Sequence, residues 1–229
     1  MSRAAALGVP LSASAAAALV ALLDRIGLEP QNLTTIEGLE EGIDRHLADS
    51  LAGLMLPEVA GAASSVDIGS GAGFPGLALA IARPDLAVTL VESERRKADW
   101  LRRASADIPN VRVVADRSEH LAKAERETFP LATMRALGPL PVALELAAPF
   151  VSVGGAVVAW RGDDADPATE AAGARAAREL GLEPRPPVAS AAFPGSRRRL
   201  QVFAKVAPTP SRYPRRAGRA AKKPIGGER

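Results

Sequence analysis

Hydrophobic residues near the start of the chain recur at the spacing of amphipathic helices. Leucine or isoleucine occupies positions 19, 22, 23 and 26, which share one helix face, and Ser12 or Ser14 can cap the start. A second run over residues 37–56 keeps this period until Pro57, which disfavours helical backbone in the residue before it. We therefore predict two helices in an N-terminal extension over residues 1–60.

From residue 64 onward, short apolar runs alternate with amphipathic segments. Strands are predicted at 65–68, 87–91, 111–115, 131–134, 156–160 and 200–206, and helices at 75–82, 94–106, 118–124, 140–150 and 167–180. Alternation of strand and helix implies a parallel sheet with helices on both faces. The pattern therefore predicts an α/β domain over residues 61–206.

The last 23 residues differ in charge from everything before them. Residues 207–229 carry seven Lys or Arg side chains and one acid, whereas the whole chain has a net charge of +3, so the body is slightly acidic. Such a tail suits a polyanionic partner or simply aids solubility, and charge alone leaves both open. Its Pro and Arg content predicts disorder in solution.

Composition narrows the chemistry. Apolar residues make up 47% of the chain, which is enough for a substantial core, and there are no cysteines, so disulfides, thiolate metal sites and a Cys nucleophile are excluded. With only two histidines, His46 and His120, we expect no metal site. The apolar N-terminal stretch is broken by Asp24 and Arg25, and no run reaches about 18 uncharged apolar residues. We expect a soluble cytoplasmic protein without a membrane segment.

The clearest motif is VDIGSGAGFPG at residues 66–76, at a predicted strand-to-helix turn. Small residues there let the backbone bend tightly and approach a ligand. The glycine spacing fits both the dinucleotide pattern G-x-G-x-x-G and the first motif of S-adenosylmethionine-dependent methyltransferases. Asp67 would repel a pyrophosphate but could serve the cationic methionine moiety, and Pro75 lacks the N–H that a phosphate would need. The loop therefore favours S-adenosylmethionine, with a nicotinamide oxidoreductase as the weaker alternative. The candidate cofactor-binding residues are Asp67, Gly69, Gly71 and Gly73.

Glu92 ends the second predicted strand, 23 residues after Gly69. An acid at this place accepts hydrogen bonds from ribose hydroxyls in nucleotide-binding α/β folds. The alternative is a surface acid that caps the next helix. Because the position falls where the glycine motif requires it, we predict a cofactor contact.

The methyl acceptor can be narrowed by the groups available to activate it. Pyrimidine C5 needs a covalent Cys, which is absent, and exocyclic amines are usually served by Asn or Asp before two prolines, where this chain reads TMRAL at 133–137. Carbon acids and hydroxyls usually need a His, Lys or metal base, for which no convincing candidate is found. A ring nitrogen such as guanine N7 attacks with its own lone pair. The sequence therefore favours an acceptor that needs no base.

Several segments together resemble one family of RNA-modifying enzymes. They are the glycine loop 67–77, Asn32-Leu33-Thr34, Arg45-His46-Leu47-Ala48-Asp49-Ser50, Arg135-Ala136-Leu137, Arg198-Arg199-Leu200 and the tail residues 208–218. In this order they resemble the ribosomal RNA small-subunit methyltransferase G family, also called glucose-inhibited division protein B. The resemblance implies S-adenosylmethionine-dependent methylation of N7 of one guanine in 16S rRNA, by in-line transfer without a general base. It also implies a class I, Rossmann-like methyltransferase fold with a mostly parallel seven-stranded sheet, a helical N-terminal extension and a basic C-terminal tail.

The resemblance further implies particular site residues. Cofactor contacts are expected at Gly69, Phe74, Glu92, Ser118, Glu119 and Arg135. Arg135 ends the fourth strand and is expected nearest the chemistry, but a permanently protonated Arg does not act as a base. RNA contacts are expected at Arg96, Arg117, Arg198, Arg212, Arg215 and Arg216. His46 is expected to brace the extension against the cofactor domain.

The expected partner is 16S rRNA, either free or in the small ribosomal subunit or one of its assembly intermediates, and the expected oligomeric state is a monomer. Three further hypotheses stay open: a methyltransferase fold that acts on another RNA, a methyltransferase that acts on a protein or a small molecule, and an RNA-binding module without activity.

Overall fold

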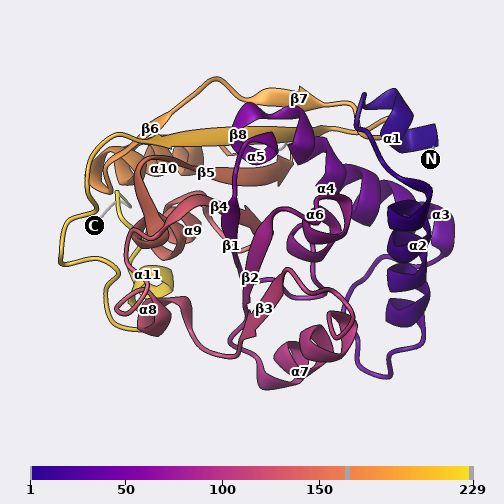
Figure 1. Ribbon diagram of the computed structural model, residues 1–229. Coiled ribbons are helices and arrows are strands. Elements are labelled where there is room, and N and C mark those ends of the chain that lie inside the picture. Colours follow the sequence, from indigo (N-terminus) through magenta and orange to yellow (C-terminus); the bar gives the residue numbers. More distant parts are fainter. Residues whose placement is uncertain (1, 163–165, 227–229) are drawn as a thin grey trace.

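A central sheet with helices on both faces forms the body of the computed structural model, which describes residues 2–162 and 166–226 (Figure 1). The strands are β1 Ser64–Ile68, β2 Ala87–Val91, β3 Val111–Val114, β4 Phe129–Arg135, β5 Val151–Gly162, β6 Leu182–Pro184, β7 Val188–Ser190 and β8 Arg198–Lys205. Helix α5 Pro57–Ala60 precedes the first strand, and the helices between the strands are α6 Gly76–Ala82, α7 Arg95–Ala104, α8 Ser118–Leu121, α9 Leu140–Ala147 and α10 Pro167–Glu179. The predicted α/β architecture is confirmed.

The strand order is β3-β2-β1-β4-β5-β8-β6, with β7 paired to β8 beside this path. The first five strands are parallel, and β8 runs antiparallel to β5, β6 and β7. The seven-strand path agrees with the prediction, and the short β7 makes the sheet eight-stranded. Neither β6 nor β7 was predicted, because a strand of three residues is too short to show an alternating pattern.

The register of the parallel strands brings their carboxyl ends to one edge. Ile68 at the end of β1 lies opposite Val91 of β2 and Met134 of β4. Glu92 and Arg135 are the residues that follow these two partners. Ligands of open α/β sheets bind at this edge, beside the point where the strand order reverses between β1 and β4.

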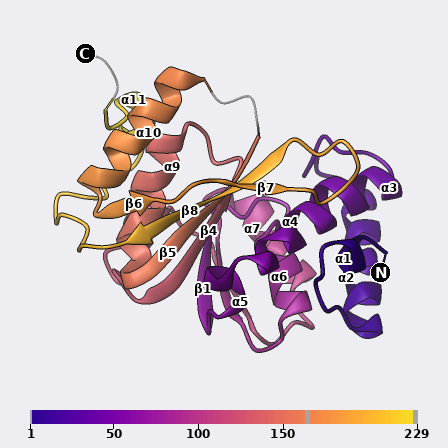
Figure 2. The same ribbon diagram turned by 90° about the horizontal axis from the view of Figure 1, so that it is seen from above.

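Helices cover both faces of the sheet (Figure 2), and a hydrophobic cluster lies on each face. On one face, Leu144 of α9 and Ala176 of α10 pack against the sheet. On the other, Leu77 of α6 and Trp100 of α7 share a cluster with Leu51 of the N-terminal extension. The extension is therefore packed into the same core as the sheet.

The extension begins with α1 Ser2–Ala6 and α2 Ala13–Gly27. Ser12 caps α2, because its Oγ accepts the backbone N–H of Ala15 at 3.1 Å, as predicted. The second predicted helix is not one regular α-helix. It runs through α3 Leu39–Gly42, a π-helical turn η1 Ile43–Ala48, α4 Asp49–Leu51 and a 3-10 turn η2 Ala52–Met55. A π-turn is uncommon and often marks a functional site.

Residues 207–226 of the basic tail pack on the body of the protein. The prediction that the tail is disordered is therefore wrong for these residues. Tyr213, Ala220 of the short helix α11 Arg219–Lys222, and Ile225 are buried. Arg215 donates from its backbone N (3.1 Å) and Nε (2.8 Å) to Oε1 of the buried Glu145 of α9. Composition alone could not show that these few apolar side chains and one buried carboxylate anchor the segment. Among the described helices, none is both long enough and apolar enough to span a membrane.

Candidate active site

A pocket of about 690 Å³ opens at the carboxyl edge of the sheet. Both the α/β domain and the extension form its wall. The domain supplies residues 69–72, 74, 92, 97, 135–138, 160–162 and 198, and the extension supplies residues 33–36, 45 and 46. The volume suits a cofactor together with part of a second substrate.

The glycine loop after β1 forms the floor of this pocket. Gly69, Gly71 and Gly73 all have positive φ, at 69°, 54° and 108°, which side chains rarely tolerate. A Cβ on Gly69 would overlap Cδ1 of Leu137, so the two loops that follow β1 and β4 are in close contact at this glycine. Gly69 and Gly71 line the pocket, whereas Gly73 packs towards Leu77 and connects the loop to α6.

Glu92 lies at the end of β2 with its carboxylate almost fully buried. Its Oε2 accepts the N–H of Gly71 at 2.9 Å, and its Oε1 accepts the N–H of Glu94 at 2.8 Å. Each carboxylate oxygen has a second lone pair, so Glu92 can also accept hydroxyl protons from a ligand in the pocket. The glycine cradle and this acid have the chemistry that the methionine and ribose parts of S-adenosylmethionine require, and the cofactor contacts of Gly69, Gly71 and Glu92 stay predictions.

Asp67 lies elsewhere than the sequence predicted. Its side chain is buried beneath the loop, where Oδ1 accepts the hydroxyl of Thr133 at 2.7 Å, and it does not line the pocket. Burial raises the pKa of this carboxyl group, against the effect of the Thr133 hydrogen bond. Asp67 therefore braces β1 against β4, and because its carboxylate is not among the groups that line the pocket, the pocket lining does not support the expected contact with the cationic methionine moiety.

Arg135 lies where β4 ends and is held from several sides. Its guanidinium lies over the ring of Phe74, 5.4 Å from the centroid. Nη1 donates to the backbone oxygen of Arg45 at 3.0 Å and to Oδ2 of Asp49 at 3.2 Å. Nη2 lies 3.2 Å from Nδ1 of His46. The side chain predicted nearest the chemistry thus joins the extension to the sheet at the pocket wall.

His46 is neutral in this arrangement. Its ring stacks on Phe74 with centroids 4.5 Å apart, and Nε2 lies 2.9 Å from Oγ1 of Thr34. Because Arg135 can only donate, Nδ1 must accept, which places the ring proton on Nε2 for donation to Thr34. Burial, with the charge of Arg135, lowers the pKa of His46 to about 4. The predicted bracing role of His46 is confirmed, and its position in the pocket wall is an addition.

The remaining predicted residues lie away from the pocket, with one exception. Ser118 and Glu119 of α8 are buried outside its lining, and Glu119 Oε1 accepts the N–H of Gly218 in the tail at 3.0 Å. Arg198, on β8, does line the pocket, and the other predicted RNA-binding arginines lie elsewhere. Arg117, Arg212 and Arg215 pair with Glu119, Glu179 and Glu145. Of these arginines outside the pocket, Arg96, Arg117, Arg212 and Arg216 are exposed.

Sequence reasoning missed Thr34 and Trp160 as pocket residues. The indole Nε1 of Trp160 donates to the backbone oxygen of Asp49 at 2.8 Å, close to the end of β5. The place of Trp160 at a carboxyl strand end was a usable signal, because this is the ligand-binding edge. Nothing in the sequence showed that the segment around Thr34 folds over this edge.

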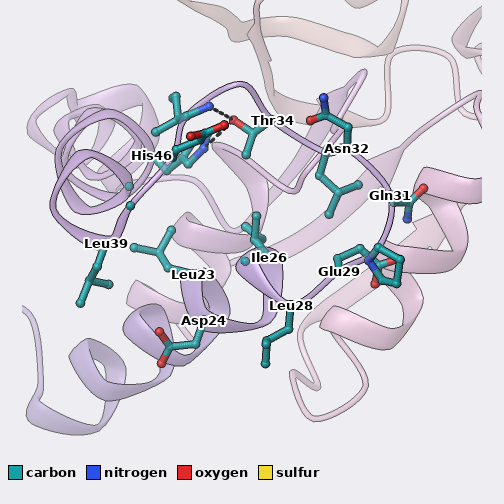
Figure 3. A pocket seen from close by; sticks show the side chains of 17 residues that line it. Leu23, Asp24, Ile26, Leu28, Glu29, Gln31, Asn32, Thr34, Leu39 and His46 are labelled. Carbon is teal, nitrogen blue, oxygen red and sulfur yellow. Dashed lines mark hydrogen bonds between the residues drawn. The ribbon is translucent and has the colours of Figure 1, made fainter.

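A second hollow, of about 750 Å³, lies against the extension (Figure 3). It is lined by the end of α2 and the segment 28–39, and it shares Leu33, Thr34, Ile36 and His46 with the first pocket. Figure 3 shows Thr34 and His46 turned towards one another, joined by their hydrogen bond. The two hollows therefore adjoin one another at these four residues of the extension.

The fold and this pocket define a class. A parallel sheet with one antiparallel strand inserted next to β5, a glycine loop after β1 and an acid after β2 are the features of class I S-adenosylmethionine-dependent methyltransferases. Solved structures agree on the fold: the Methanococcus jannaschii fibrillarin pre-rRNA processing protein matches with a TM-score of 0.55 at 15% identity, covering 70% of this chain and 74% of that one. A predicted O-methyltransferase from Agrobacterium tumefaciens matches with a TM-score of 0.53 at 23% identity, covering 72% and 81%.

The particular family follows from sequence comparison. The profile described as rRNA small subunit methyltransferase G matches residues 12–181. Ribosomal RNA small subunit methyltransferase G of Chloroflexus aggregans is 40% identical over 96% of this chain and 94% of its own length, and that of Deinococcus radiodurans is 39% identical over 91% and 84%. The chain therefore belongs to the ribosomal RNA small subunit methyltransferase G family, and the resemblance seen in its sequence is confirmed.

Proposed function

We propose that this chain transfers a methyl group from S-adenosylmethionine to N7 of a guanine in 16S rRNA. The observation that carries the proposal is the make-up of the pocket, in which a cofactor cradle meets an arginine-rich wall that offers no general base. Among the described lining residues, Glu92 is the one carboxylate, and it accepts backbone N–H groups. His46 is neutral, but the lone pair on its Nδ1 accepts a hydrogen bond from Arg135 and is therefore not available as a base. An acceptor that attacks without losing a proton fits this wall.

The chain's own residues bind and orient the two substrates. Gly69, Gly71 and Phe74 would hold the methionine end of the cofactor, and Glu92 would accept its ribose hydroxyls. The bound cofactor supplies a methyl group that its sulfonium has already activated. Arg135 would hold the pocket wall against which the guanine lies. The N7 lone pair can then be aligned with the bond between the cofactor's sulfur and its methyl group, which is the bond that breaks. N7 gains the methyl group and a positive charge, and no proton has to move.

RNA is proposed to reach the pocket along a basic rim. Arg45, Lys97, Arg161 and Arg198 line the opening, and such side chains bind phosphates in a salt-dependent way that positions RNA without choosing a base. Ser118, Glu119, Arg96, Arg117 and Arg216 are proposed as further cofactor or RNA contacts outside this opening. We further propose that the protein acts as a monomer in the cytoplasm, on rRNA or on the small subunit.

The test is methyl transfer from radiolabelled S-adenosylmethionine to small ribosomal subunits that lack the modification, with the labelled base identified by mass spectrometry. Label on guanine N7 is the expected result. Label on another base or another RNA would leave a methyltransferase with a different substrate. Cofactor binding with no label on any RNA would overturn the proposal in favour of an RNA-binding module without activity.

A further inference from the structure

Asp49 follows the π-helical turn of the extension, and its carboxylate lies buried between two arginines. Oδ2 is 3.2 Å from Nη1 of Arg135 and 3.9 Å from Nε of Arg198. The side chain has no exposed surface, and within the described residues Oδ1 has no hydrogen-bond partner. A buried carboxylate that is only partly satisfied costs stability, so packing alone does not account for it.

The two arginines come from strands that are not neighbours. Arg135 ends β4 and Arg198 begins β8, with β5 between them in the sheet, and both line the pocket. Like charges at one wall repel each other, and more strongly where water is partly excluded than in bulk water. A carboxylate in contact with both offsets this repulsion and keeps both guanidiniums at the wall.

These arginines lie on the β4 and β8 side of the pocket, although the guanidinium of Arg135 also lies over Phe74 of the cofactor cradle, 5.4 Å from the ring centroid. The glycine loop and Glu92 follow β1 and β2, whereas Arg135, Trp160 and Arg198 belong to β4, β5 and β8. Asp49 reaches this side from the extension, and its backbone oxygen also accepts the indole N–H of Trp160 at 2.8 Å. One residue of the extension therefore contacts three residues of the wall that the methyl acceptor would meet.

We propose that Asp49 is a positioning residue that holds Arg135 and Arg198 together on the acceptor side of the pocket, so that the N-terminal extension completes the active site. The inference rests on the proposed function, since the two guanidiniums are taken to face the acceptor RNA. The proposal also assigns a role to the π-helical turn, which directly precedes Asp49 and sets the direction in which Asp49 meets the sheet.

The test compares Asp49→Asn with wild type in three measurements: kcat and KM for small subunits, the cofactor Kd by calorimetry, and the melting temperature. The Asn keeps the shape but removes the charge, so kcat/KM should fall at least about tenfold while the cofactor Kd stays within about twofold. Asp44→Asn is the matched control, because Asp44 lies in the π-helical turn that precedes Asp49 but pairs with Arg3 at 2.6 Å. It should behave as wild type. If Asp49→Asn weakens cofactor binding and kcat/KM to the same degree, Asp49 is merely structural and the proposal is overturned.

A double-mutant cycle with Arg198→Gln tests whether Asp49 acts through the arginine. The double variant should be little worse than the poorer single variant, because both substitutions disrupt one unit, whereas effects that multiply would overturn the proposal. Arg198 is partly exposed, so this variant should fold even if Asp49→Asn does not, and an unchanged kcat/KM in Arg198→Gln would also overturn it. If wild type binds RNA but transfers no methyl group, the proposed function fails separately, and the cycle is then measured in the Kd for a 16S rRNA fragment.

Discussion

At the scale of single residues, protonation of the His46 ring changes the stability of the folded protein. Its folded-state pKa of about 4 lies below the ordinary value of 6.5, because burial and Arg135 disfavour the charged form. The unfolded chain therefore takes up this proton first as the pH falls. The stabilisation that neutral His46 provides is complete above pH 6.5 and is lost progressively between pH 6.5 and 4.

We predict that His46→Gln removes this pH dependence. Between pH 6.5 and 4, wild type should lose about 2 to 3 kcal/mol more of its free energy of unfolding than the variant, from a pKa difference of about two units. Urea unfolding at a series of pH values measures both curves, and taking their difference cancels the other titrating groups. Parallel curves would show that His46 titrates normally and that Arg135 does not use it as an acceptor.

Glu92 offers a second test at this scale, directed at the cofactor. Glu92→Ala removes the acceptor of the Gly71 N–H and the proposed acceptor of ribose hydroxyls, so the cofactor Kd should rise at least about tenfold, as expected for hydrogen bonds to a charged group. Calorimetric titration measures the change. Glu94→Ala is the matched control, because Glu94 is exposed and pairs with Lys97 at 2.9 Å. Equal weakening by both would argue against a specific role for Glu92.

At the scale of elements, the extension docks on the sheet through a close contact at Gly53. Gly53 lies in the 3-10 turn η2, and a Cβ there would overlap the indole of Trp160. We predict that Gly53→Ala lowers the free energy of unfolding by about 2 kcal/mol through overpacking. It should also lower methyl transfer, since Trp160 lines the pocket. Gly27→Ala is the control, because a Cβ at that helical position meets open space and should leave stability equal or slightly higher. Denaturant unfolding of both variants measures the difference. Equal free energies of unfolding for Gly53→Ala and Gly27→Ala would contradict the close contact between Gly53 and Trp160.

The elements that sequence predicts well are those with a long regular pattern. β2 begins and ends where its apolar run does, and Ser12 caps α2 as expected. The π-helical turn was not predicted, because an extra residue in one turn leaves the apolar spacing of 37–56 almost unchanged. The glycines of the loop after β1 and Glu92 after β2 were predictable because the carboxyl ends of parallel strands meet at one edge of the sheet.

What could not be predicted depends on contacts between distant segments. The direction of Asp67 depends on Thr133 of the neighbouring strand, and the closure of the pocket depends on Thr34, in a segment without a periodic pattern. Asp49 becomes a contact of two arginines only when β4, β8 and the extension are assembled. Such residues carry no local signal, since their neighbours in sequence are not their neighbours in space.

At the scale of the whole molecule, the basic tail combines two kinds of arginine. Arg215 pairs with the almost fully buried Glu145, close to Tyr213, whereas Arg216 is exposed. Removal of Arg215 would leave a buried charge without its partner, which typically costs about 3 kcal/mol. Removal of an exposed arginine costs little stability but removes one positive charge that RNA could meet. The same tail can therefore hold the fold together and bind a polyanion with different residues.

We predict that Arg215→Ala lowers the free energy of unfolding by about 3 kcal/mol and reduces amide-exchange protection across residues 213–223, whereas Arg216→Ala changes neither. For RNA binding the order should reverse. For Arg216→Ala, the slope of log Kd against log salt concentration should decrease by about the amount expected for the loss of one phosphate contact. For Arg215→Ala, the slope should stay unchanged under conditions where that variant is folded. Unfolding curves and salt titrations of both variants separate the two roles. A loss of slope with Arg215→Ala alone would mean that the pair with Glu145 opens when RNA binds, and that the packed tail is a state of the free protein.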